Sequence, residues 1–308
     1  MKRAAALAIF LFFSFGAAAQ QLPNRAGSFR FGVIGDSGTG GTRQYTIGAL
    51  LGEYQKSLGF QTVLMLGDNI YGRHRPKDFR KKFELPYQAL LDAGVKFHAA
   101  LGNHDSASQT FYKPFNMEGR RYYTFSPREG IRFFALDSTF MDKPQLEWIE
   151  KELAGSGSGW KIVYFHHPIY SSGARHGSDL PLRAVLEPLF VKYGVSLVLA
   201  GHDHFYERIK PQQGIYYFVI GGSAKLRARN VRRTPLTAKA FDLDNSFAVM
   251  EIDRDTLHFQ AIGRKGATVD FGSFERVSAS VGSRPARPGQ KKSDTASELR
   301  IAPSSAAP

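Results

Sequence analysis

The chain of 308 residues contains no cysteine. This absence excludes a disulfide scaffold and any metal site built from thiolates. A metal bound by this protein must therefore be held by oxygen and nitrogen ligands. Such ligands favour hard or borderline ions such as iron, manganese, zinc or magnesium.

Long apolar runs are also missing, except near the N-terminus. Lys2 and Arg3 precede the apolar stretch Ala4–Phe15, which is too short to span a bilayer comfortably, and Ala17–Ala19 is typical of a cleavage site. We predict a signal peptide over residues 1–19 and a mature protein that is exported, periplasmic or secreted, with no membrane span. The alternative is an uncleaved membrane anchor.

Large apolar residues are sparse at the other end of the chain. The stretch from Val277 to Pro308 is rich in Ser, Ala, Pro, Lys and Arg, which predicts a disordered tail over residues 276–308. The composition of residues 28–275 is instead that of one large globular domain with a sizeable core.

Acidic residues are outnumbered, with 27 Asp and Glu against 41 Lys and Arg and a net charge of +14. A local basic cluster consists of Lys225, Arg227, Arg229, Arg232 and Arg233. It is either a solvated loop or a surface that attracts anionic substrates. No nucleic-acid recognition motif accompanies the charge.

Strand-like apolar runs alternate with helical stretches along the central part of the chain. The predicted strands are Phe29–Ile34, Gln61–Leu66, Val95–Leu101, Ile131–Leu136, Trp160–Phe165, Val195–Ala200, Tyr216–Ile220, Phe247–Ile252 and Leu257–Ile262. The predicted helices are Thr42–Lys56, Lys77–Leu91, Pro144–Leu153 and Leu182–Tyr193. This alternation predicts a layered α/β fold, in which sites form at the carboxyl ends of the strands.

Five short blocks with polar residues lie at the ends of predicted strands. They are Gly35–Gly38, Gly67–Tyr71, Gly102–Asp105, Val163–Pro168 and Gly201–His204. One such block alone is ordinarily structural. Five blocks at strand ends offer enough Asp, Asn and His ligands for two metal ions, an arrangement suited to displacement at a phosphoryl group.

The ordered set GD, GDxxY, GNHD, VxxH and GHDH resembles the calcineurin-like metallophosphoesterases, and within them the small, tartrate-resistant type of purple acid phosphatase. Gly38 stands where many members of the superfamily carry a histidine ligand, and Tyr71 stands where the purple phosphatases place a tyrosine. A phenolate is a hard donor that suits Fe(III). The resemblance implies a single domain with two central mixed β-sheets flanked by helices.

The resemblance also implies two metal ions, Fe(III) and a divalent Fe, Zn or Mn ion. The implied ligands of the first metal are Asp36, Asp68, Tyr71 and His204, and those of the second are Asp68, Asn103, His166 and His202. Asp68 would bridge the two ions. For Tyr71 taken by itself, the alternative is a packed surface aromatic.

Further histidines receive roles from the same resemblance. His104 would act as the general acid, and His176, in a His-Gly stretch after the VxxH block, would lie on the substrate side. The alternative for His176 is a surface-loop histidine. His167 is expected to point away from the site along its strand, and Asp105 and Asp203 to support the neighbouring ligands.

These patterns predict an exported hydrolase of phosphoric monoester bonds, acid phosphatase-like, that acts on small phosphorylated substrates. A metal-bound hydroxide would attack phosphorus, and His104 would protonate the leaving oxygen. Two alternatives stay open: a phosphodiesterase on the same metal core, and a non-catalytic exported protein that holds polyanions through the basic cluster and the tail.

Overall fold

The computed structural model describes residues 22–276. The predicted signal peptide lies outside these residues, as does the predicted tail beyond Arg276. Within the described part of the chain, no helix has the length and apolarity needed to cross a bilayer.

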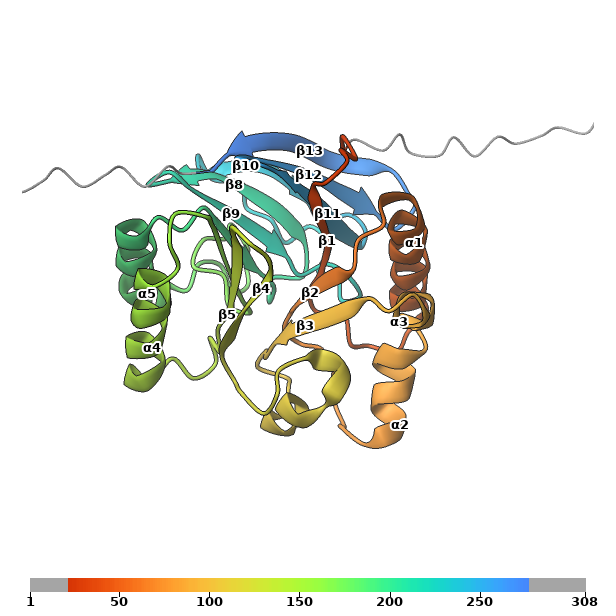
Figure 1. The fold of residues 1–308 in the computed structure, drawn as a ribbon. Coiled ribbons are helices and arrows are strands. Elements are labelled where there is room, and N and C mark those ends of the chain that lie inside the picture. The colour runs from red at the N-terminus through yellow and green to blue at the C-terminus, as the bar shows by residue number, and fades with distance from the viewer. Residues whose placement is uncertain (1–21, 277–308) are drawn as a thin grey trace, which may run out of the picture. The chain divides into compact units, whose positions relative to one another are not determined.

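Two β-sheets form the centre of the fold (Figure 1). The first has the order β13–β12–β11–β1–β2–β3 and consists of β1 (Phe29–Ile34), β2 (Thr62–Leu66), β3 (Lys96–Ala100), β11 (Ser246–Asp253), β12 (Thr256–Gly263) and β13 (Thr268–Glu275). The second has the order β10–β8–β9–β7–β6–β5–β4 and consists of β4 (Tyr123–Arg128), β5 (Ile131–Ala135), β6 (Trp160–Phe165), β7 (Leu197–Ala200), β8 (Tyr206–Gln212), β9 (Ile215–Ile220) and β10 (Thr237–Phe241).

Parallel strands occupy one part of each sheet. In the first sheet β1, β2 and β3 are parallel neighbours, and in the second β5, β6, β7 and β9 are parallel. The remaining strands pair antiparallel, so both sheets are mixed. The turns that follow the parallel strands of one sheet therefore lie at one edge of it, where sites form in such folds.

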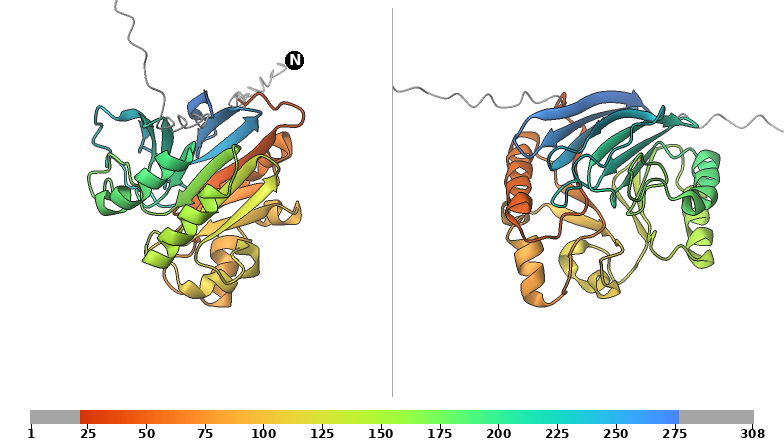
Figure 2. Two further views of the ribbon diagram at one scale, coloured as in Figure 1. Left: turned by 60° about the vertical axis from the view of Figure 1, so that its left-hand side comes forward. Right: turned by 180° about the vertical axis from the view of Figure 1, so that it is seen from behind.

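Helices cover the outer faces of the sheets (Figures 1 and 2). The helices α1 (Thr42–Leu58), α2 (Pro76–Phe79) and α3 (Gln88–Asp92) lie beside the first sheet, and α4 (Lys143–Ala154) and α5 (Leu180–Tyr193) lie beside the second. The larger core includes buried side chains of both sheets, such as Phe31 and Phe133, whose ring centroids lie 5.3 Å apart. A second core joins α4 and α5 to the second sheet. The predicted sandwich of two mixed sheets flanked by helices is confirmed.

One predicted helix, Lys77–Leu91, is wrong as a single element. The segment is divided into α2, a π-helical turn at Arg80–Glu84, and α3. Pro86 lies between the π-helical turn and α3. Proline has no N–H to donate to the preceding turn, so it interrupts the helix here. Its carbonyl packs against α1 at Gly48, where a Cβ would lie 2.1 Å from that oxygen.

Candidate metal centre

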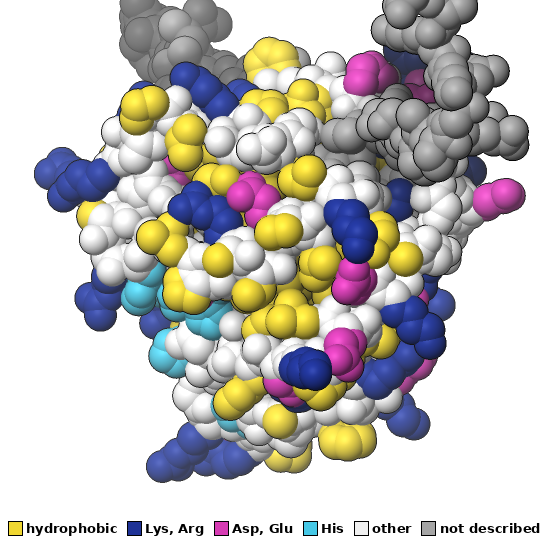
Figure 3. Space-filling model, turned by 90° about the vertical axis from the view of Figure 1, so that its left-hand side faces the viewer, with side chains coloured by type: hydrophobic (Ala, Val, Ile, Leu, Met, Phe, Trp, Pro, Cys, Tyr) yellow, Lys and Arg dark blue, Asp and Glu magenta, His cyan; other side chains and the backbone are white. Residues whose placement is uncertain are grey.

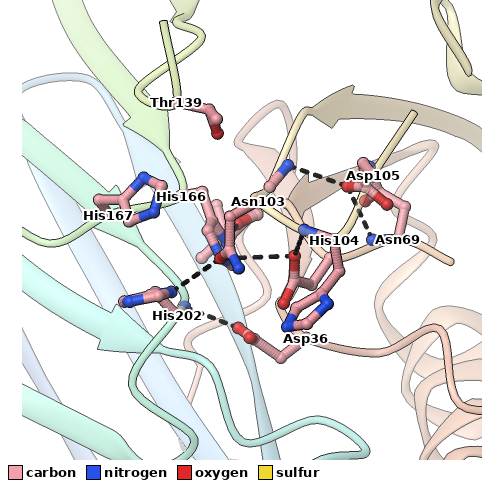
Figure 4. Close-up of polar contacts among 12 residues, drawn as sticks. Asp36, Asn69, Asn103, His104, Asp105, Thr139, His166, His167 and His202 are labelled. Atoms are coloured by element: carbon pink, nitrogen blue, oxygen red, sulfur yellow. Dashed lines mark hydrogen bonds and ion pairs between the residues drawn. The ribbon is translucent and has the colours of Figure 1, made fainter. Parts of the chain in front are cut away.

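The turns after β1, β2 and β3 meet the turns after β6 and β7, so that ligand side chains from both sheets converge (Figure 4). Asp36, Asp68 and Asn103 come from the first sheet, and His166 and His202 come from the second. Two groups of potential ligand atoms result, each within 4.8 Å of one another: Asp36, Asp68 and His204, and His166, His167 and His202.

The first group is centred on the buried carboxylate of Asp36. The Tyr71 hydroxyl donates to Asp36 Oδ1 over 3.0 Å, and His204 Nε2 lies 3.2 Å from the same oxygen and 3.3 Å from the Tyr71 oxygen. Burial, and then the charge of Asp68, raises the pKa of Asp36 well above its usual value. Such a carboxylate is costly to keep ionised without a nearby cation.

The Tyr71 hydroxyl is held in its neutral form by the same surroundings. Burial, followed by the charges of Asp36 and Asp68, raises the pKa of Tyr71. A bound cation reverses this balance, because coordination favours the deprotonated donor. Tyr71 is thus placed at the first ligand group rather than as an isolated surface aromatic.

At the second group, the lone pairs of two side chains, His166 and Asn103, face one another. His166 Nδ1 lies 2.9 Å from the Leu66 carbonyl oxygen, which only accepts, so Nδ1 carries the proton. Burial lowers the pKa of His166 well below its usual value, so the ring is neutral. Its Nε2 lone pair therefore faces the Asn103 Oδ1 lone pair at 3.0 Å. A cation between these two atoms would stabilise the contact, so this donor set fits a metal ion.

Asp68 and His202 join the two groups. Asp68 Oδ1 lies 3.5 Å from His166 Nε2, and the carboxylate also belongs to the group of Asp36 and His204. His202 Nδ1 lies 3.1 Å from both Asn103 Oδ1 and His166 Nε2, while its backbone N–H donates to Asp36 Oδ2 over 2.8 Å. Asp68 thus lies between the two groups of potential ligand atoms.

Three of these residues have left-handed backbone conformations. The φ angles are 53° at Asp36, 52° at Asp68 and 66° at His202. Such conformations cost about 1–3 kcal/mol each in residues other than glycine and cluster at functional sites. Gly38 is also required sterically, because a Cβ there would lie 1.9 Å from the Asn69 carbonyl oxygen.

His104 and His176 are exposed side chains at the rim of the centre. The His104 ring lies 5.0 Å from the Tyr71 ring, and its backbone N–H donates to Asp68 Oδ1 over 2.9 Å. The His176 ring lies 4.3 Å from the ring of His202. Both histidines are therefore brought to the centre, from opposite sheets.

The expectation that His167 points away from the centre is wrong. Its ring lies 4.4 Å from the ring of His202, and its Nδ1 lies 2.9 Å from Ser138 Oγ. The β6 strand ends at Phe165, so the alternation of side chains along a strand no longer applies to residues 166 and 167.

Ser138 also lies at the centre, although none of the five sequence blocks contains it. Its Oγ accepts the backbone N–H groups of His166 and His167 over 3.2 Å and 3.0 Å. Ser138 follows β5 closely, and a polar residue after a predicted strand was the available signal.

Asp105 and Asp203 hold the loops that carry the ligands. Asp105 accepts backbone N–H groups from Asn69, Ile70 and Gly102 over 2.9–3.0 Å. Asp203 Oδ2 accepts the Ser171 hydroxyl over 2.5 Å and the backbone N–H of Gly177 over 3.2 Å. These positions agree with the supporting roles expected of both carboxylates.

Two mixed sheets that aim carboxylates and histidines at one edge define the class of metal-dependent phosphoesterases. The family model for calcineurin-like phosphoesterases matches residues 29–206. The chain belongs to this family.

Curated relatives include purple acid phosphatases from plants and mammals. The chain is 30% identical over 224 residues to Fe(3+)-Zn(2+) purple acid phosphatase 12 of Arabidopsis thaliana, covering 63% of this chain and 46% of the relative. It is 26% identical over 213 residues to tartrate-resistant acid phosphatase type 5 of Mus musculus, covering 58% of this chain and 64% of the relative. The chain thus spans about half to two thirds of the length of these relatives.

Two further comparisons extend over more of the chain. Purple acid phosphatase 4 of Arabidopsis thaliana is 27% identical over 278 residues, covering 78% of this chain and 82% of that protein. The solved structure of purple acid phosphatase PPD1 from yellow lupin (Lupinus luteus) has a TM-score of 0.68 at 19% identity, covering 83% of this chain and 55% of that one. This structural similarity shows a shared fold.

Proposed function

We propose that this protein is an exported phosphatase that hydrolyses phosphate monoesters at a binuclear metal site. The observation that carries the proposal is the pair of facing lone pairs on His166 Nε2 and Asn103 Oδ1, next to the buried carboxylates of Asp36 and Asp68. Similarity to purple acid phosphatases supports the same function.

The proposed ligand sets extend the two groups of converging atoms: Tyr71 joins the first, and Asp68 and Asn103 take the place of His167 in the second. Asp36, Asp68, Tyr71 and His204 would hold Fe(III), and Asp68, Asn103, His166 and His202 would hold a divalent ion. The name of the Arabidopsis relative, an Fe(3+)-Zn(2+) enzyme, supports this pair of ions. When bound, two such ions lower the pKa of water and neutralise charge on phosphoryl oxygens.

The remaining steps belong to side chains at the rim. His104, exposed beside Tyr71, would donate a proton to the leaving oxygen, and His176, beside His202, would hydrogen-bond to the phosphate. The backbone N–H of His104 donates to Asp68, and that of His202 donates to Asp36. The backbone of the proposed acid is therefore hydrogen-bonded directly to a proposed metal ligand.

Two substitutions test the proposed roles on p-nitrophenyl phosphate. Asp68→Ala removes the shared carboxylate, so metal content by elemental analysis and activity should be lost together. His104→Ala should retain metal but lower kcat by about a hundredfold or more, the usual contribution of a general acid.

His258→Ala, on β12 within the outer part of the first sheet, is the matched control for loss of an imidazole. Full activity in Asp68→Ala would refute the proposed centre. Loss of metal from His104→Ala would assign His104 to metal binding rather than to proton transfer.

The iron assignment has an optical test. A Tyr71 phenolate on Fe(III) gives a visible charge-transfer band, so the protein loaded aerobically with iron should be coloured and Tyr71→Phe should not. A band of equal intensity in Tyr71→Phe, or a colourless iron-loaded protein, contradicts this assignment.

The type of ester is tested with p-nitrophenyl phosphate and bis-p-nitrophenyl phosphate at equal metal loading. We expect kcat/KM to be higher for the monoester. A higher value for the diester would favour a phosphodiesterase on the same metal core.

A further inference from the structure

Three cationic side chains beside the proposed metal centre form no ion pair with a carboxylate among residues 22–276. Lys225 Nζ lies over the Tyr71 ring, 4.5 Å from its centroid. The backbone N–H of Arg227 donates to the His204 carbonyl oxygen over 3.1 Å. Arg175 lines a cavity of about 300 Å³ together with His167, His176 and His202. Figure 3 shows histidine side chains gathered on one face with Lys and Arg side chains around them.

Backbone pairing joins the loop that carries Arg175 to the loop that carries Arg227, and the charges of both arginines act on His176. Residues 171–177 form one loop and residues 221–233 form another. Gly173 forms an isolated bridge with Val231, and the N–H of Ala174 donates to the Asn230 carbonyl over 2.8 Å. The basic cluster is thereby divided: Lys225 and Arg227 are partly buried, whereas Arg229, Arg232 and Arg233 are exposed.

The guanidinium of Arg227 is poorly compensated. Its Nη1 is shielded from water and has no hydrogen-bond partner within the described chain. Burial, and then the charge of Arg175, lowers the pKa of Arg227. Asp203 offsets part of this charge, but its carboxylate bonds to Ser171 and Gly177. By contrast, Arg208 is paired with Asp270 at 2.8 Å.

A partly buried cation without a partner is costly, and an anion placed against it relieves the cost. Arginine is suited to this task because its planar fork binds phosphate or carboxylate oxygens in pairs. The cavity beside His176 and His202 borders the place proposed for the scissile phosphate. It has room for a further group of phosphate size.

We propose that Arg175 and Arg227 form a subsite for a second anionic group, phosphate or carboxylate, carried by the part of the substrate that leaves. The inference rests on the proposed phosphatase function. Water adds across the bond between phosphorus and the leaving oxygen, inorganic phosphate is released, and the second anionic group stays on the other product. The substrate class is thus a phosphate ester or anhydride with a neighbouring anion.

The test compares kcat/KM for ADP and for 2-phosphoglycolate with kcat/KM for p-nitrophenyl phosphate, in the metal-loaded full chain. In Arg227→Gln and in Arg175→Gln, each ratio to p-nitrophenyl phosphate should fall by about tenfold or more, the usual size of a charged hydrogen bond. Arg227→Lys keeps the charge, so its kcat/KM ratios should fall by less than those of Arg227→Gln. A fall for ADP alone assigns the subsite to phosphate, and a fall for both substrates assigns it to either anion.

Arg233→Gln is the matched control, because it removes an exposed arginine from the same loop. Its ratios should equal those of the wild type. Unchanged ratios in both test variants, or an equal fall in the control, would overturn the subsite. If Arg227→Gln does not fold, the kcat/KM ratios of Arg175→Gln still test the subsite, because Arg175 is exposed. A wild-type protein with no activity on p-nitrophenyl phosphate would instead overturn the proposed function itself.

Discussion

At the scale of single residues, Asp105 shows how one carboxylate positions two ligand turns. It accepts backbone N–H groups from the turn after β2 and from the turn after β3, together with the Gln109 side-chain amide over 2.7 Å. The turns carry Asp68 and Asn103. The geometry of the proposed centre therefore depends on a residue that need not touch a metal.

We expect Asp105→Ala to lower the free energy of unfolding of the chelated protein by about 2–4 kcal/mol, because several donors lose their acceptor. Urea unfolding in the presence of EDTA measures this. Asp92→Ala, at the exposed end of α3, is the control and should change the value by less than about 0.5 kcal/mol. Equal effects of the two substitutions would contradict the role given to Asp105.

A second residue-scale prediction concerns His98 on β3, whose ring stacks on Phe125 with centroids 3.7 Å apart. Burial, and then the charge of Lys96, lowers the pKa of His98 to about 4. The usual value is about 6.5, so between these two values the unfolded chain binds a proton that the folded chain does not. Stability should therefore fall as the pH drops through this window.

His98→Phe keeps an aromatic ring against Phe125 and removes the titration. The loss of stability between about pH 8 and about pH 5 should be smaller in this variant by roughly 1–2 kcal/mol. Urea unfolding of the chelated proteins at both pH values measures the difference. An identical loss in wild type and variant would show that His98 does not contribute.

The sequence predicted that the candidate ligands would lie together, but it did not predict their local geometry. Asp36, Asp68 and His202 follow predicted strands, and their convergence could be expected from the carboxyl-end rule for such sheets. Their left-handed backbone conformations could not be predicted, because a positive φ angle is uncommon even in Asp and His and no sequence pattern marks the residue that adopts it. The expectation for His167 was wrong because the alternation of side chains was extended beyond Phe165, where both the predicted strand and β6 end.

At the scale of elements, the buried parallel strands were the most predictable part of the fold. Apolar runs such as those of β2, β6 and β7 are buried along their whole length. The strands β4, β8, β10 and β13 were not predicted. Three of them lie at sheet edges or expose several side chains, so their sequences carry more polar residues and no clear apolar run.

The coupling of β8 to the loop that carries His176 leads to an element-scale prediction. Glu207 on β8 is fully buried and accepts the backbone N–H of Ser172 over 2.8 Å, the Ser172 hydroxyl over 2.5 Å and the Thr237 hydroxyl over 2.7 Å. A buried carboxylate that is held by three donors fixes the loop relative to the sheet.

Glu207→Gln should loosen that loop, because an amide donates where the carboxylate accepts. We expect faster amide hydrogen exchange in residues 171–178 and a KM for p-nitrophenyl phosphate that rises about threefold to tenfold, with metal content unchanged. Glu129→Gln, on an exposed turn, is the control. Unchanged exchange in residues 171–178 would show that Glu207 does not hold the loop.

At the scale of the whole domain, each proposed metal would join the two sheets. The first proposed ligand set combines Asp36 and Asp68 with His204, and the second combines Asn103 with His166 and His202. Without metal, the edge where these turns meet contains buried carboxylates and opposed lone pairs, which lower stability. The proposed function and the stability of this edge would therefore depend on the same ions.

Chelation should accordingly lower the melting temperature and loosen one edge of the domain. A ligand at a hundred times its dissociation constant stabilises the native state by about 2.7 kcal/mol. Hydrogen exchange should accelerate in the turns after β1, β2, β3, β6 and β7, while α4 and α5, on the outer face of the second sheet, should change little. In Asp68→Ala the metal-loaded and chelated samples should melt at the same temperature, since the shared carboxylate is gone. Equal melting temperatures of the metal-loaded and chelated wild type would refute the idea that the ions join the sheets.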